Sequence, residues 1–159
     1  MKVAHDVFAE TNPAYCAHVI ASFVRAYQSI SEQGADLVLC YLSLPISLSG
    51  ELTSTFEQTN RNTGLLEWIR RNPAIQIGLA ERVDDTLNVV TEAIQFGCFS
   101  QILTMDGAGR VSPGTKRFRR PPHHSEEISS VLKHSERLGY WMAMAGSTRT
   151  TLDMMGITV

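Results

Sequence analysis

Apolar residues recur at helical spacing in most segments of this chain, and one stretch departs from that pattern with strand-like alternation. The departure lies between residues 99 and 112, where apolar and polar residues alternate around an Asp106-Gly107 step. Asp-Gly between two β-prone runs is typical of a tight turn, so we expect a β-hairpin with strands at 99–104 and 110–112. The sequence therefore predicts a mainly α-helical protein with one small β-hairpin.

Two long amphipathic helices are expected on either side of this hairpin. Asn12, followed by proline, predicts the start of the first, over about 13–32, because Asn caps helices and Pro tolerates the first turn. Ser125 predicts the start of the second, over about 125–146, since two glutamates in its first turn favour the helix dipole. Ser147 is the expected cap of a last short helix.

Residues 36–48 are almost wholly apolar and are expected to be buried. We predict a short helix that Pro45 ends near Ser43, because proline lacks the N–H that continues a helix. A buried strand is the alternative, since a short apolar run fits either structure.

Three further short helices are expected before the hairpin. Thr63 and Asn72 are the predicted caps of the first two. The predicted apolar face of the first consists of Leu65, Leu66 and Ile69, with Trp68. Asp84 and Asp85 precede the third, over about 84–97, and acidic side chains favour the N-terminal end of a helix. The predicted core face of this third helix consists of Leu87, Val90, Ala93 or Ile94, and Gly97.

Consecutive short helices followed by a hairpin are the parts of a winged helix-turn-helix. We therefore predict a winged-helix-like core at about residues 36–112, flanked by N- and C-terminal helices, with the C-terminal helical part at about 125–159. A length of 159 residues fits one domain, so residues 1–159 are predicted to fold as a unit.

The cysteines indicate a reducing compartment. Cys16, Cys40 and Cys98 are odd in number and far apart, and each lies among apolar residues, so we expect buried free thiols. The first residues lack the pattern of a signal peptide, and no apolar run approaches the length of a membrane helix. The sequence thus predicts a cytoplasmic protein with no membrane segment.

No catalytic residue, metal site or cofactor is predicted. The sequence contains neither a G-x-S-x-G nucleophile motif nor the glycine-rich motifs that hold phosphates. His123 and His124, with Glu126, lie in the one histidine cluster, and adjacent histidines in a loop point apart, so we interpret them as exposed loop residues. A metal ion held tightly by these three residues would instead favour an enzyme.

A basic run follows the predicted hairpin. Five of the 14 Lys and Arg residues lie between Arg110 and Arg120, although the whole chain has a net charge of −2. The run suits contact with nucleic-acid phosphates or with an acidic partner, and a solvated loop without a partner is the alternative. The residues predicted to make such contacts are Lys116, Arg117, Arg119 and Arg120.

The helix that a winged helix would place in a DNA groove argues against base recognition. It carries Asp84, Asp85 and Glu92 and no arginine, so its charge would repel the DNA backbone. We interpret this helix as a core element or a protein-binding element.

The C-terminal residues 141–159 hold four of the six methionines and a tryptophan. Apolar surface rich in methionine adapts to its partner, so this region is a candidate interface, with plain core packing as the alternative. The predicted partner-interface residues are Trp141, Met154 and Met155.

Four stretches, in this order, resemble one protein family. They are FAETNPAYCAHVIASFVRAY, then YLSLPISL, then TGLLEWIRRNPAIQIGLAERV followed by TEAIQFGCFSQI, and finally SERLGYWMAMAGSTRTTLDMMGITV. The chain is similar in these motifs, over nearly its full length, to the middle component of bacterial three-component ABC-ATPase systems. The matching positions include Asn12, Pro13, Cys16, Leu44, Pro45, Trp68, Asn72, Pro73, Arg82, Phe96, Gly97, Leu138, Gly139, Trp141, Thr151, Gly156 and Val159.

This resemblance implies a function. Such middle components are encoded beside an SMC/Rad50-like ABC ATPase and an effector subunit, and they resemble non-enzymatic adaptors in defence against phage or plasmids. The chain is therefore expected to bridge that ATPase and that effector, and any DNA contact would come through the complex. A stand-alone winged-helix DNA-binding regulator is the alternative.

Overall fold

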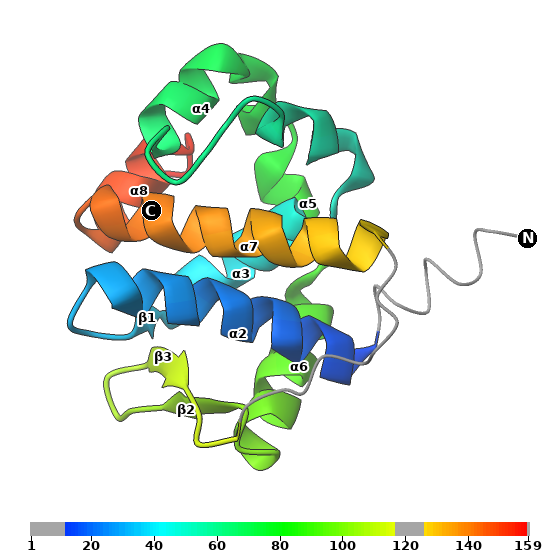
Figure 1. Cartoon of the computed structure of the whole chain (residues 1–159), viewed down its shortest axis with the longest axis vertical. Helices are drawn as coiled ribbons and strands as arrows, with labels where there is room; N and C mark the ends of the chain where they lie inside the picture. Colours follow the sequence, from blue (N-terminus) through cyan, green and yellow to red (C-terminus); the bar gives the residue numbers. More distant parts are fainter. Residues whose placement is uncertain (1–11, 117–125, 159) are drawn as a thin grey trace, which may run out of the picture.

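The computed structural model describes residues 12–116 and 126–158 of the chain (Figure 1). Its α-helices are α2 (Pro13–Ile30), α3 (Leu37–Leu48), α4 (Leu65–Arg71), α5 (Leu79–Asp85), α6 (Leu87–Phe99), α7 (Glu126–Met144) and α8 (Thr148–Met154). Its 3-10 helices and strands are η1 (Gly50–Phe56), η2 (Pro73–Gln76), β1 (Ala35–Asp36), β2 (Leu103–Met105) and β3 (Arg110–Pro113). The predicted class, mainly helical with a small antiparallel β-structure, is confirmed.

The predicted hairpin is present and consists of β2 and β3. The Asp106 side chain closes its turn, because one carboxylate oxygen accepts hydrogen bonds from the backbone N–H groups of Ala108 (2.9 Å) and Arg110 (3.0 Å). The first strand begins later than predicted, since α6 continues through Phe99. These N–H donors also lower the pKa of the Asp106 carboxyl group.

A third strand, β1, was not predicted, because two residues are too few to show any alternation. It pairs with β3, with Ala35 opposite Val111, so the sheet has the order β1-β3-β2. Gly34 allows this close approach, since a Cβ atom there would lie 2.6 Å from the carbonyl oxygen of Val111. This order is compatible with a winged helix.

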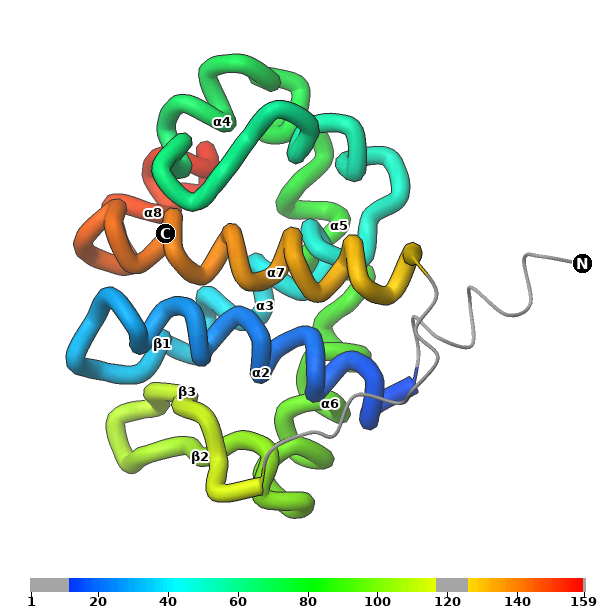
Figure 2. Tube along the Cα trace, viewed as in Figure 1, coloured from blue at the N-terminus to red at the C-terminus, as the bar shows by residue number. Residues whose placement is uncertain are grey.

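The two long helices, α2 and α7, lie side by side and run in the same direction (Figures 1 and 2). Small residues bring their backbones together. The Ser135 hydroxyl donates to the carbonyl oxygen of Val19 (2.7 Å), and the Ser22 hydroxyl donates to that of Leu132 (3.1 Å). A Cβ atom at Gly139 would overlap α2. The pair is therefore closely packed, and α2 also packs against α3 and α6.

Aromatic side chains hold the segment between α3 and α4 against α7. Phe56 lies 5.1 Å from Trp68 and 6.0 Å from Trp141, measured between ring centroids. Both indoles donate to the backbone of this segment, from Trp68 to the carbonyl oxygen of Thr55 (3.1 Å) and from Trp141 to that of Asn60 (3.0 Å). The two tryptophans therefore pack in the core and also hold the segment that precedes α4 in place.

The prediction that Pro45 ends the helix over residues 36–48 near Ser43 was wrong, since α3 continues to Leu48. A proline inside a helix costs about 3 kcal/mol. Here Leu44 and Ile46, on either side of Pro45, are fully buried, and their burial offsets that cost.

The predicted Thr63 cap was wrong, because its hydroxyl accepts from the backbone N–H of Asn60 and Gly64 stands at the start of α4 with φ +82°. Asn72 does stand at the N-cap position, before the short η2. Its side chain makes no capping hydrogen bond and instead donates to the Trp68 carbonyl. The Ser147 cap is confirmed, since its hydroxyl oxygen accepts from the backbone N–H of Thr150.

The helix predicted at 84–97 differs at its start. Asp84 and Asp85 end α5, and α6 begins at Leu87. Most of the predicted core face is buried, but Leu87 is exposed because it lies in the first turn, to one side of that face. The buried residues of α6 are Val90, Ala93, Ile94 and Gly97.

The predicted free thiols are confirmed for all three cysteines. Cys16 and Cys40 are fully buried, whereas Cys98 is half-buried. Burial raises the pKa of the Cys40 thiol to about 12 and also raises that of Cys98, so both are protonated near neutral pH.

Within the described ranges, no single helix is both long enough and apolar enough to cross a membrane. Together α3 and η1 reach such a length and composition only across a bend of 92°. Most of the α3 side chains are buried in the core of the fold.

Candidate functional site

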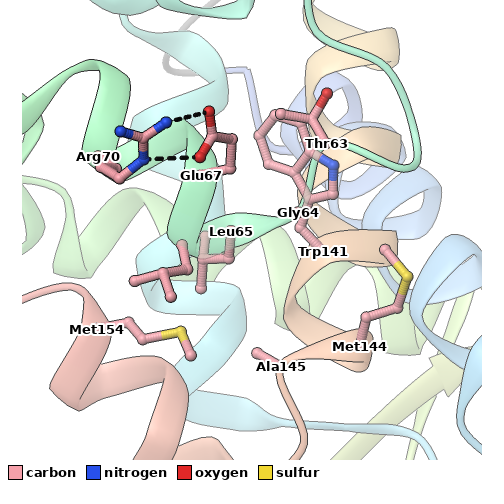
Figure 3. Close-up of a pocket in the computed structure, with 10 residues that line it drawn as sticks. Thr63, Gly64, Leu65, Glu67, Arg70, Trp141, Met144, Ala145 and Met154 are labelled. Carbon is pink, nitrogen blue, oxygen red and sulfur yellow. Dashed lines mark hydrogen bonds and ion pairs between the residues drawn. The ribbon is translucent and has the colours of Figure 1, made fainter.

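An apolar groove opens where α4, the end of α7 and α8 meet (Figure 3). Its volume is about 430 Å³. The buried side chains of Leu65 and Trp141 line it, and Met144 and Met154 flank it. Together these residues leave an apolar hollow that is open to solvent.

Exposed apolar side chains surround this groove. Leu66 is 61% exposed and Met144 is 45% exposed, and Met154 is half-buried. Methionine is unbranched and polarizable, so two methionines beside a hollow adapt to the shape of an incoming side chain. The arrangement suits the docking of an apolar side chain from another protein.

A charged pair forms part of the rim. The Arg70 guanidinium donates two hydrogen bonds to Glu67, at 2.8 and 2.9 Å, and Arg71 donates a third at 2.9 Å. These bonds lower the pKa of the Glu67 carboxyl group to about 2, so it is ionised at neutral pH. The rim beside Leu66 therefore stays polar and hydrated.

Local geometry fixes the position of α8 relative to α4 and α7. Gly146, with φ +100°, makes the turn between α7 and α8. The Gln76 side-chain amide donates to the carbonyl oxygen of Met154 (2.7 Å), and the Thr148 hydroxyl donates to the Asp36 carboxylate. The groove is therefore held on both sides by contacts between segments far apart in the sequence.

The predicted interface residues divide into two kinds. Trp141 is 0% exposed and Met155 is 1% exposed, so both pack in the core. Of these two, Trp141 lines the groove and Met155 does not. Met154 is accessible and lines the groove. The role of these three residues in partner binding stays a prediction.

Two groove residues, Leu66 and Met144, were not predicted as contacts. The prediction that Leu66 belongs to the apolar face of its helix was wrong, since its side chain is 61% exposed. A signal for both was present, since neither fits the apolar stripe of its own helix. The stripe of α4 runs through Leu65, Trp68 and Ile69, and Leu66 projects away from it. An apolar residue off the stripe of an amphipathic helix is the pattern that marks an exposed contact.

The basic run is only partly described. Lys116 is exposed, and its backbone N–H donates to the carbonyl oxygen of Gln101 (3.0 Å). The other predicted contact residues, Arg117, Arg119 and Arg120, lie outside the described residues. Contact of this run with nucleic acid or with an acidic partner therefore stays a prediction.

No group of three or more His, Cys, Asp or Glu residues in the described ranges is arranged to hold a metal ion. His123 and His124 lie outside those ranges, and Glu126 is exposed in the first turn of α7. His134 stacks on Phe56 at a ring-centroid distance of 4.1 Å, and burial together with Arg137 lowers its pKa to about 4. This ring is neutral at pH 7 and serves the aromatic core.

Two other hollows are lined differently. One, of about 340 Å³, lies beside Pro45 and is partly closed by the ion pair of Arg82 with Glu51 at 3.0 Å. The other, of about 280 Å³, is lined by charged side chains and Tyr140, over which the Arg61 guanidinium stacks at 4.2 Å. Neither has apolar side chains as exposed as those of the groove.

Comparison with known families gives a match over nearly the whole chain. The family described as "ABC-three component (ABC-3C) system Middle Component 3" matches residues 2–159, which is nearly the whole chain. Comparison with curated proteins and with solved structures finds no match.

Proposed function

This chain belongs to the ABC-three component system Middle Component 3 family, and from that membership we propose a non-enzymatic adaptor function. The chain would bridge an SMC/Rad50-like ABC ATPase and an effector subunit in a cytoplasmic bacterial complex that defends against phage or plasmids. The match over residues 2–159 is the observation that carries this proposal, because a middle component is one part of a system of three.

The groove supports an adaptor role. An adaptor needs accessible surface that a partner can desolvate, and binding energy in such interfaces is concentrated in a few apolar anchors that fill pockets. The open hollow beside Leu66, Met144 and Met154 offers such a pocket on a rigid base. We therefore assign the groove to one of the two partner subunits.

The connection of the groove to the rest of the fold suits the transmission of a partner's state. Trp141 lines the groove and belongs to α7, which packs along α2. A partner that shifts α7 would therefore also act on α2 and on the helices packed against it. The proposed adaptor would pass on the state of the ATPase in this way, while the ATPase itself performs the nucleotide chemistry.

The test is co-purification of the tagged chain, co-expressed with the ABC ATPase and effector encoded beside it. Two groove variants, Leu66→Asp and Met144→Asp, place a charge in the apolar hollow at exposed positions that the fold tolerates. A matched control is Ile77→Asp, since Ile77 is 79% exposed and lines none of the hollows described above. Loss of one partner with the groove variants but not with Ile77→Asp is the expected result.

The rival proposal is a stand-alone winged-helix regulator that binds DNA by itself. The helix that precedes the hairpin, α6, contains no Lys, Arg or His and exposes Glu92, which disfavours approach to phosphates. Duplex binding by the isolated chain, weakened by salt and abolished by neutralising the basic run, would support this rival. Absence of both partners after co-expression would remove the adaptor proposal.

A further inference from the structure

The C-terminal end of α6 leaves a large aromatic side chain almost fully in solvent. Phe99 is 92% exposed, and Phe96, one turn before it, is 38% exposed. Single exposed apolar residues are ordinary on protein surfaces. Two exposed aromatic residues one turn apart form a small patch, and we name Phe96 and Phe99 the α6 patch.

A small rotation of α6 would not bury Phe99, because this residue lies opposite the buried face of the helix. The face of α6 that packs in the core is formed by Val90, Ala93, Ile94 and Gly97. At 100° per residue, Phe99 lies on the opposite side of the helix from that face, and Glu92 lies on the same side as Phe99. The side chain of Phe99 therefore points away from the fold.

Gly97 fixes the orientation of this helix end. A Cβ atom at Gly97 would lie 2.8 Å from the Cγ atom of Leu103, so the glycine lets β2 pack directly on the helix. Leu103 is itself buried. The helix end and the strand are thus locked together, and the α6 patch is presented on a rigid base.

The charge that α6 carries beside the α6 patch is negative. No Lys, Arg or His occurs in α6, whose outward face carries Glu92, and the exposed Asp84 and Asp85 directly precede the helix. Lys116, by contrast, lies next to Gln101 beyond the other end. The outward face of α6 therefore carries one carboxylate, that of Glu92, and is apolar at its C-terminal end.

We infer that the outward face of α6 is a docking surface for a basic, amphipathic segment of a partner protein. Its apolar side chains would cover Phe99 and Phe96, and its Lys or Arg side chains would lie along Glu92 and Asp84-Asp85. Complementary charge steers such encounters and sets their register, while buried aromatic anchors supply most of the affinity. DNA fits this face poorly, because phosphates beside Phe99 would meet the Glu92 carboxylate, and α6 itself contains no Lys, Arg or His.

This surface is distinct from the groove. Along the longest axis of the molecule, the groove between α4, α7 and α8 lies in the upper half of Figure 1, and the end of α6 beside β2 lies at the bottom. Two binding surfaces toward opposite ends are what a bridging subunit requires. The inference therefore rests on the proposed function, and it assigns the α6 face to the partner that does not occupy the groove.

The experiment uses the full chain co-expressed with the ABC ATPase and the effector encoded beside it, with photoreactive p-benzoylphenylalanine replacing Phe99. The expected result is a cross-link, located by mass spectrometry, to an apolar segment of one partner that is flanked by Lys or Arg. A cross-link to a second copy of this chain or to nucleic acid, or no cross-link within a complex that does assemble, would overturn the inference.

Two variants give an independent measurement. Phe99→Ala should weaken retention of that partner at least about tenfold, as expected for loss of an aromatic anchor. Glu92→Arg should weaken retention of that partner most at low salt. At high salt the attraction between Glu92 and the partner's cations is already screened, so its loss has less effect. The matched controls Ile77→Ala and Glu57→Arg change exposed residues elsewhere and should retain both partners.

The outcomes separate the two proposals. If both partners co-purify and neither Phe99→Ala nor Glu92→Arg changes their retention, the inference about α6 is wrong and the adaptor proposal stands. If no partner co-purifies with the unchanged chain, the adaptor proposal fails and the α6 inference falls with it.

Discussion

Replacing Gly139 with alanine tests the close packing of α2 against α7. A Cβ atom there would lie 2.8 Å from the Cβ atom of Ala26, 3.1 Å from the backbone N of Tyr27, and closer still to the carbonyl oxygen of Phe23. The closest neighbour is backbone, so the two helices must move apart. Overpacking of this kind costs about 1–3 kcal/mol, whereas Gly-to-Ala in a helix interior gains about 1 kcal/mol.

Because the closest neighbour is rigid backbone on α2, we expect an overpacking cost in the upper part of that range, about 2–3 kcal/mol. The net effect of Gly139→Ala is then a destabilisation of about 1–2 kcal/mol. For a chain of this size that corresponds to a fall in Tm of about 3–6 °C, measured by circular dichroism on heating. The matched control is Gly107→Ala, where an added Cβ meets nothing within 4 Å, and its stability should change by less than about 0.5 kcal/mol. A Gly139→Ala protein as stable as the parent would refute the close packing of α2 and α7.

Three further predictions concern the core and the basic run. Trp141→Phe removes the donor to the carbonyl oxygen of Asn60, so urea unfolding should show a loss of about 1–2 kcal/mol, and an unchanged midpoint would contradict the role of that bond. Burial and Arg137 lower the pKa of His134 from 6.5 to about 4, so the unfolded chain takes up this proton first and stability should fall as the pH drops from about 6.5 towards 4. His134→Phe keeps the stack on Phe56 and should make that fall shallower, and a parallel fall in both proteins would count against this cause. Charge reversal in the basic run should weaken binding to DNA or to an acidic partner without lowering Tm, and unchanged binding would exclude the run from either role; the positions to reverse are Arg117, Arg119 and Arg120.

The long helices were predictable because local signals and core burial agree there. Asn12 caps α2 with hydrogen bonds to the N–H groups of Ala14 (2.9 Å) and Tyr15 (3.3 Å), as expected, and the apolar stripe behind it is buried. The end of the helix that contains Pro45 was harder to predict. Proline disfavours a helix locally, but burial of the residues on either side of it favours the helix. Local rules fail where tertiary burial is worth more than the local cost.

Contacts between segments far apart in the sequence were the second feature that the sequence did not predict. No pattern in two residues predicts β1, whose partner lies in β3, far along the chain. The same holds for the groove, since α4 and α8 approach each other only in the fold. From the sequence alone, Trp141 and Met155 were predicted as contacts, but both are buried. Leu66 was predicted on the apolar face of its helix, but it is exposed.

Size and hydrophobicity do not distinguish an anchor for a partner from an anchor for the core. Phe99 shows this most clearly, because it stands in an apolar run and was predicted to begin a strand. In the fold it ends α6 and points away from the core face. Only its orientation relative to that face marks it as a candidate contact.

The most direct test of the adaptor proposal is quantitative mass spectrometry of the complex that co-purifies with the tagged chain, co-expressed with the proposed ABC ATPase and effector partners. The account predicts recovery of both partners in fixed ratio, with one lost on Leu66→Asp and the other on Phe99→Ala. Recovery of the chain alone, or with DNA but without the ATPase, would contradict it.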